Sequence, residues 1–188
     1  DGVIGQMMEK VVLPEQRTRL TDEEVIARCP WATTGRTHHR TPNIITSLEL
    51  DPAEMEKRNI HLQKKYAEIE ENEVRFEELH CEDAEYLIVA FGSCARIAQK
   101  AMEMAREEGI KVGLLRPITL WPFPSKAIAA RAAQVKGILT VELNAGQMVE
   151  DVRLAVECKV PVEHFGRLGG IVPDPDEVIT ALKEKLIK

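Results

Sequence analysis

The pentapeptide Gly92-Ser93-Cys94-Ala95-Arg96 combines residue types that can hold an anion. It follows an apolar run, Tyr86 to Phe91, and opens an amphipathic stretch, Ala95 to Glu108. A glycine turn between a buried strand and a helix leaves backbone N–H groups unpaired, and such groups attract phosphates and carboxylates. The Ser93 hydroxyl and the Arg96 guanidinium add further donors. We therefore consider an anion site here; in the simpler interpretation, the glycine permits close packing and Arg96 pairs with an acid.

Other side chains also have types that support chemistry. Cys94, near a helix start, is either a reactive thiol or a small buried filler. Glu142, at a predicted strand end, is either an acid or base, or a helix cap or salt-bridge partner. The adjacent His38 and His39, beside Arg36 and Arg40, suggest metal or anion binding, but no third ligand is spaced to join them, so we expect a solvated loop and no metal site. We predict no catalytic residue in this chain.

The phrase from Arg116 to Pro124 has two interpretations. Because Arg116 ends a predicted strand and Trp121 is a large aromatic residue, the phrase is a candidate substrate loop. Three prolines in nine residues favour instead a rigid, packed connector with Trp121 as its anchor. We expect the second, an interface or packing role.

From residue 83 onward, strand and helix patterns alternate. The predicted strands are short apolar runs at 85–92, 111–115, 137–143 and 160–165. The predicted helices follow them at 95–108, 125–134, 147–157 and 175–187. This alternation is typical of an α/β fold with a mostly parallel sheet, right-handed crossovers and helices on both faces. Glu163 and His164 interrupt the last run, which predicts an edge strand there.

Residues 15–80 carry many charges and no parallel-sheet pattern. Thr21 and Glu24 predict a capping box for a short helix that ends near residue 28. We also predict a strand over 44–50. A long helix is predicted over 52–71, with Asp51 as its cap. This helix has an apolar stripe that consists of Met55, Leu62, Tyr66 and Ile69. Because such a stripe must be buried, we expect the helix to dock on its own domain.

The composition argues against several classes of function. A net charge of −6 without a long basic cluster argues against nucleic-acid binding. No segment approaches the length needed to cross a bilayer, so we expect no membrane association. The four cysteines are widely spaced, which indicates free thiols in a reducing cytoplasm and no metal site. Because the chain opens on Asp1, we expect a fragment of a longer polypeptide.

Several phrases together resemble the α subunit of the 2-oxoacid:ferredoxin oxidoreductases, of the 2-oxoisovalerate or 2-oxoglutarate type, and in particular its C-terminal half. The most specific are Arg116 to Pro124 and Gly146-Gln147-Met148. Further matching phrases are Gly5 to Glu9, Pro30-Trp31-Ala32, Ala90 to Ser93 with Ala95-Arg96, Val141-Glu142 with Asn144, and Gly166-Arg167 with Gly169-Gly170. The resemblance covers nearly the whole chain.

The resemblance implies a three-layer α/β/α domain like the transketolase C-terminal domain. Its mostly parallel five-stranded sheet contains one antiparallel strand. On this basis residues 1–15 are the tail of a pyrimidine-binding domain, 16–82 an extension with the long helix, and 83–188 the α/β domain. The first and third strands named above become neighbours, which places Gly92-Ser93 opposite Glu142 to Asn144.

The resemblance also implies a function. In the family, the whole enzyme oxidatively decarboxylates a 2-oxoacid on thiamine diphosphate with Mg²⁺. The acyl group goes to coenzyme A, and electrons pass through iron–sulfur clusters to ferredoxin. None of the thiamine diphosphate or cluster sites maps onto this chain, so we expect it to carry no cofactor of its own and to be inactive alone.

The expected role is assembly with the β subunit and the other subunits. Coenzyme A is the candidate anion for Gly92, Ser93, Arg96 and Asn144, which we call the anion corner. Two other interpretations stay open. One is the equivalent domain of a transketolase-like or 2-oxoacid dehydrogenase enzyme, and the other is a stand-alone nucleotide-binding module.

Overall fold

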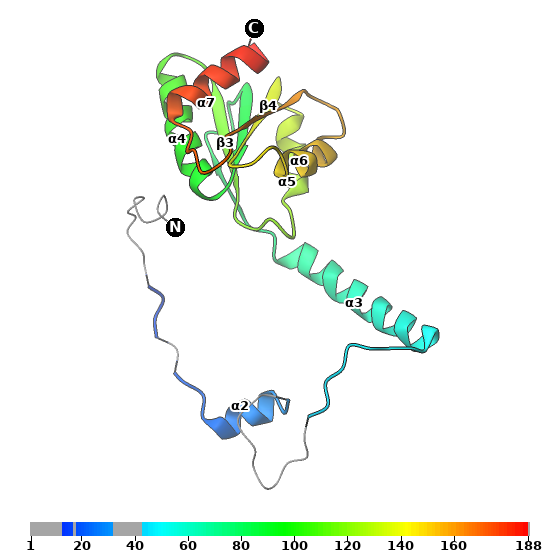
Figure 1. Cartoon of the computed structure of the whole chain (residues 1–188). Helices are drawn as coiled ribbons and strands as arrows, with labels where there is room; N and C mark the ends of the chain where they lie inside the picture. The colour runs from blue at the N-terminus through cyan, green and yellow to red at the C-terminus, as the bar shows by residue number, and fades with distance from the viewer. Residues whose placement is uncertain (1–12, 17, 32–42, 188) are drawn as a thin grey trace. The chain divides into compact units, whose positions relative to one another are not determined.

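The structure is a computed structural model that describes residues 13–16, 18–31 and 43–187 (Figure 1). The chain divides into two compact units, one containing His61–Lys188 and the other within Met8–Ile60. The predicted tail at residues 1–15 and the His38-His39 pair fall largely or wholly outside the described residues.

The helices of the upstream region form where local capping predicts them. Helix α2 (Asp22–Arg28) begins with the predicted capping box, in which Thr21 and Glu24 exchange side-chain to backbone hydrogen bonds. Helix α3 (Pro52–Asn72) is capped by Asp51, whose carboxylate accepts hydrogen bonds from two amides of the first turn. Neither helix contains a buried residue.

The strand predicted over 44–50 is wrong, because this segment is irregular. Its side chains are open to solvent, with Ile44 90% and Leu50 82% exposed. A strand requires a neighbouring strand to accept its backbone hydrogen bonds, and the described part of the Met8–Ile60 unit contains none. Apolar residues alone therefore did not suffice to form a strand there.

The His61–Lys188 unit is built on one five-stranded sheet in the order β1-β3-β2-β4-β5. Strands β2 (Tyr86–Ala90), β3 (Val112–Pro117), β4 (Gly137–Glu142) and β5 (Val162–Gly166) run parallel. Strand β1 (Phe76–Leu79) pairs antiparallel with β3. Strand β5 lies at an edge as predicted, and the first and third predicted strands, β2 and β4, are neighbours.

Successive residues of each strand face opposite helical layers, as the pleat requires. Ile88 and Ala90 pack with α4 (Gly92–Glu107) and α7 (Pro175–Leu182), which a π-helical turn (Lys183–Ile187) follows. Leu87 and Val89 pack with α5 (Ser125–Ala132) and α6 (Met148–Val156). Figure 1 shows the two helical layers on opposite sides of the sheet. The predicted three-layer α/β/α fold with one antiparallel strand is therefore confirmed.

The sheet begins upstream of the boundary predicted at residue 83, because β1 belongs to it. Arg131 of α5 fixes β1 through a fork of two hydrogen bonds to the Glu78 carboxylate, at 2.9 and 2.6 Å. This contact lowers the pKa of Glu78 below its ordinary value and raises the pKa of Arg131. The antiparallel strand is therefore held by side chains as well as by its ladder.

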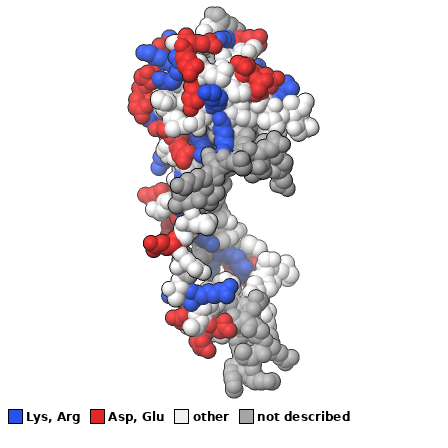
Figure 2. All heavy atoms as spheres, turned by 90° about the vertical axis from the view of Figure 1, so that its left-hand side faces the viewer, with Lys and Arg blue, Asp and Glu red and all other residues white. Residues whose placement is uncertain are grey.

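The described surface has mixed charge. Figure 2 shows basic and acidic side chains interspersed over one face of the molecule. No helix in the described part of the chain has the length and apolar character that a membrane span requires.

Candidate functional site

The carboxyl ends of the four parallel strands lie at one edge of the sheet, the usual place for a ligand in an open α/β fold. Because Ala90 of β2 pairs with Val141 of β4, the turn at Gly92-Ser93 lies beside the loop that follows Glu142. The pairing of these two strands, which the resemblance implied, is therefore confirmed.

Helix α4 begins at this edge without a side-chain cap. Gly92 has a φ of +56°, and a Cβ added there would meet nothing within 4 Å. The amides of Gly92, Ser93 and Cys94 have no hydrogen-bond acceptor among the described residues, whereas the Ala95 amide donates to the Phe91 carbonyl. The start of α4 thus presents unpaired donors and the positive end of the helix dipole.

Two further side chains of this turn, Arg96 and Cys94, are of types that could support chemistry. Arg96 is half-buried and already has an interaction partner. Cys94 is 3% exposed, and burial, assisted by the charge of Glu142, raises its pKa to about 11. Because the thiolate is the reactive form, this supports the interpretation of Cys94 as a small buried filler.

Glu142 is a buried helix cap. Its carboxylate, 1% exposed, accepts hydrogen bonds from the amides of Gln147, Met148 and Val149, at 3.2, 2.9 and 3.1 Å. These donors form the start of α6, where a negative charge is favourable. A group this enclosed has no path to a substrate proton, so the structure supports the capping interpretation over the acid–base one.

His164 completes this cluster, and sequence reasoning missed its role. Its Nδ1 lies 3.2 Å from the Thr140 hydroxyl and 3.4 Å from the Glu142 carboxylate, and its Nε2 lies 3.3 Å from the Asn144 carbonyl. Together with Glu163, it was interpreted only as a sign of an edge strand. The register between β4 and β5, which pairs Thr140 with His164, brings these groups together.

Asn144 shapes the loop between β4 and α6. Its side-chain oxygen accepts a hydrogen bond from the Gly146 amide at 2.7 Å, which closes a tight Asx turn. Its side-chain amide group donates no hydrogen bond to the described residues. That N–H group is the part of Asn144 that remains able to meet an anion.

The Arg116 to Pro124 segment is a packed connector. Pro122 and Pro124 are buried, and the Thr119 hydroxyl donates to the Pro122 carbonyl at 2.9 Å. Trp121, the predicted anchor, is instead 56% exposed and forms a T-shaped contact with Tyr66, with ring centroids 5.7 Å apart. The prediction of Trp121 as anchor is wrong because the prolines fill the interior. Arg116 forms an ion pair with Glu77 of β1 at 3.0 Å.

Comparison with known proteins identifies the family. Residues 84–178 match the profile of the pyruvate:ferredoxin oxidoreductase core domain II. The chain belongs to this family. This member of the core domain II family is 44% identical, over 184 residues, to the ketoisovalerate oxidoreductase subunit VorB of Methanothermobacter thermautotrophicus. That match covers 98% of this chain and 50% of the relative, so the chain spans about half the length of the curated relatives it matches.

Solved structures agree with this assignment. The 2-oxoglutarate:ferredoxin oxidoreductase of Magnetococcus marinus, solved with 2-oxoglutarate, coenzyme A and succinyl-CoA bound, matches with a TM-score of 0.63 and 26% identity. The match covers 72% of this chain and 24% of that one. A split-gene transketolase matches with a TM-score of 0.51 and 20% identity over 60% of this chain and 42% of that one. The transketolase match shows the fold alone. The family profile and the VorB match confirm the resemblance inferred from the sequence.

Proposed function

We propose that this chain forms the C-terminal part of the α subunit of a cytoplasmic, thiamine-diphosphate-dependent 2-oxoacid:ferredoxin oxidoreductase. The whole enzyme would convert 2-oxoisovalerate or 2-oxoglutarate to the acyl-CoA. The similarity to the ketoisovalerate oxidoreductase subunit over 98% of this chain carries the proposal. Residues 1–15 would then end a pyrimidine-binding domain, and residues 16–82 would link it to the α/β domain.

The cofactors of such an enzyme are assigned to its other parts. Among the described residues, no group of three or more His, Cys, Asp or Glu side chains could hold a metal ion. By resemblance to the family, the donors for the iron–sulfur clusters and for the Mg²⁺ of thiamine diphosphate would come from other domains or subunits. The β subunit and the other subunits would be direct partners of this chain, and ferredoxin an indirect one.

The role proposed for this domain at the sheet edge is to hold an anionic part of coenzyme A. The unpaired amides at Gly92 and Ser93 and the free amide group of Asn144 support it. Arg96, in the same first turn, would add positive charge near the bound anion without giving up its present partner. No proton transfer is assigned to this domain, because Glu142 and Cys94 are enclosed.

Turnover tests the overall function. The full enzyme, purified with its partner subunits, should reduce a dye acceptor in the presence of 2-oxoisovalerate or 2-oxoglutarate and coenzyme A, and the isolated chain should not. Turnover by the isolated chain, or a full enzyme inactive with every 2-oxoacid, would overturn the proposal.

Calorimetric titration tests the anion corner separately. Coenzyme A at millimolar concentration should release heat with the wild-type chain. The Ser93→Asp variant should release none, because its carboxylate would occupy the amides and repel the ligand. The matched control is Ser125→Asp, which adds the same charge at the start of α5 and should leave binding intact. Absence of heat with the wild-type chain would refute coenzyme A binding at the anion corner but leave the family assignment in place.

A further inference from the structure

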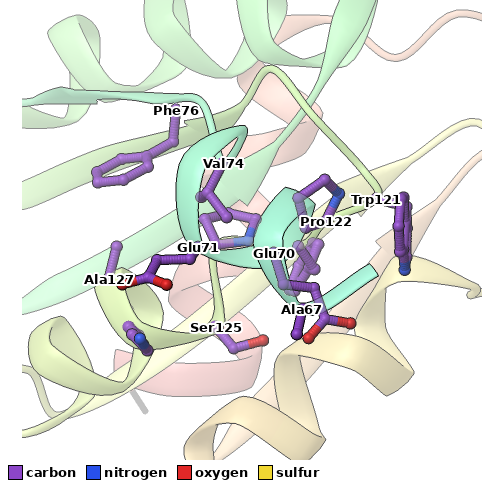
Figure 3. Close-up of a pocket in the computed structure, with 12 residues that line it drawn as sticks. Ala67, Glu70, Glu71, Val74, Phe76, Trp121, Pro122, Ser125 and Ala127 are labelled. Carbon is purple, nitrogen blue, oxygen red and sulfur yellow. The ribbon is translucent and has the colours of Figure 1, made fainter. Parts of the chain in front are cut away.

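A groove of about 1040 Å³ lies beside the end of α3, on residues other than those of the anion corner (Figure 3). One wall consists of the last turns of α3 and the start of β1: Ala67, Glu70, Glu71, Val74 and Phe76. The other wall is the continuous segment from Trp121 to Ala127. All of these residues belong to the His61–Lys188 unit.

Backbone hydrogen bonds fix the two walls to each other. The Arg75 carbonyl accepts hydrogen bonds from the amides of Ile118 and Thr119, at 2.9 and 3.1 Å. The Arg75 amide in turn donates to the Thr119 hydroxyl at 3.0 Å. Since Pro122 and Pro124 are buried behind the surface, the groove is a formed feature of the domain.

The groove exposes aromatic surface. Trp121 is 56% and Phe76 is 39% exposed, and both line it. Trp121 forms a T-shaped contact with Tyr66, and more than half of its surface stays open to solvent. Exposed tryptophan in a formed, partly apolar depression is typical of the centre of a protein–protein contact.

The charge of the α3 wall is negative. Glu70 and Glu71 both line the groove, and neither has an ion-pair partner among the described residues. Figure 3 shows both glutamate side chains extending from α3 among the residues that line the groove. They lie at the carboxyl end of the helix, where the dipole is already negative, and the last turn contains no basic residue. A cation supplied from outside would therefore stabilise this wall.

We infer that the groove receives a segment of another subunit of the assembled enzyme. The segment has apolar side chains that cover Trp121 and Phe76, and an Arg or Lys that pairs with Glu70 and Glu71. This inference rests on the proposed function, since it requires a multi-subunit enzyme. It adds the place of contact and the chemistry of the partner.

Photo-cross-linking tests the contact. The purified multi-subunit enzyme carries p-benzoylphenylalanine in place of Trp121 and, as a control, in place of Leu154. Leu154 is an exposed apolar residue, 76% accessible, outside the groove. The Trp121 position should cross-link to a different subunit, in a peptide with apolar residues and an Arg or Lys, and the Leu154 position should not give that product.

Charge reversal tests the ionic part. The double variant Glu70→Lys, Glu71→Lys should weaken association with the partner subunit about tenfold, as expected for the loss of two exposed ion pairs. The single variant Glu68→Lys is the control, because Glu68 lies on α3 without lining the groove. Its association should stay within about twofold of wild type.

The inference fails if Trp121 cross-links only within the same polypeptide, to a second copy of this chain, or to a segment without a basic residue. It also fails if the double variant associates like Glu68→Lys. Cross-linking and association are measured independently of turnover. An enzyme that turns over a 2-oxoacid but fails these tests refutes the groove alone, and a cross-linked complex without turnover refutes the proposed function alone.

Discussion

Replacing Glu142 by glutamine would test whether the buried carboxylate holds the start of α6. In the structure, one carboxylate oxygen accepts from the amides of Gln147 and Met148, and the other accepts from Val149. A glutamine of the same shape can supply an acceptor on only one side. Its NH₂ group would face the Val149 amide, so two donors would oppose each other in a buried site.

The expected loss of stability follows from these contacts. One lost hydrogen bond to a charged group costs about 1.5–3 kcal/mol. Removing the negative charge from the helix start adds about 0.5–1 kcal/mol. The free energy of unfolding should therefore fall by about 2–4 kcal/mol. For a chain of this size that corresponds to a decrease in Tm of about 4–16 °C.

Thermal unfolding of the whole chain, followed by far-UV circular dichroism, measures this change. The matched control is Glu150→Gln, which removes an acid from the exposed surface of the first turn of α6. Its Tm should fall by about 1–4 °C, because only the dipole interaction is lost. Equal effects of the two variants would refute the assignment of Glu142 as the cap.

Three further predictions concern other contacts. Glu78→Gln should cost about 1–2 kcal/mol by breaking the fork with Arg131. Since this partner lowers the pKa of Glu78 from 4.5, the stabilisation is complete above about pH 4.5 and is lost as the pH falls through the lowered pKa. Gly166→Ala should cost about 1–3 kcal/mol and shift the His164 ring resonances, because the new methyl group would overlap the Asn144 carbonyl. At pH 8, Cys158 should react with a thiol reagent and Cys94 should not, because burial raises the pKa of Cys94 to about 11.

Each of these predictions has a contrary outcome. A Tm difference between Glu78→Gln and wild type that persists unchanged at pH 3 would contradict the ionic origin of the fork. The control for Gly166→Ala is Gly169→Ala, where an added Cβ meets nothing within 4 Å, and equal shifts of His164 in both would count against the overlap. Rapid labelling of Cys94 in the folded chain would contradict its enclosure.

The doubly wound core could be predicted because its signals are local. Each strand is a short apolar run next to its own helix, and capping residues such as Asp174 mark the helix starts. Strand β1 could not be predicted in this way. Two of its four residues are glutamates, whose partners Arg116 and Arg131 lie 39 and 53 positions further along the chain. A charged strand becomes recognisable only when those partners are known.

The candidate site, too, could be predicted only in part. The strand order that the resemblance implied brought the loop after β2 next to the loop after β4, because parallel strands end at a common edge. The contact of His164 with Thr140 and Glu142 depends on the register between β4 and β5, which no local pattern specifies. The exposure of Trp121 likewise depended on which of several bulky residues fills the interior.

The upstream origin of β1 has a practical consequence for anyone who shortens this protein. A polypeptide that starts at residue 83 would retain every helix of the α/β layers yet leave the backbone of β3 bare along one side, since β1 is what pairs there. The unpaired N–H and C=O groups of an exposed strand edge can pair with other chains, which promotes aggregation. Expression of this domain should therefore start before Phe76.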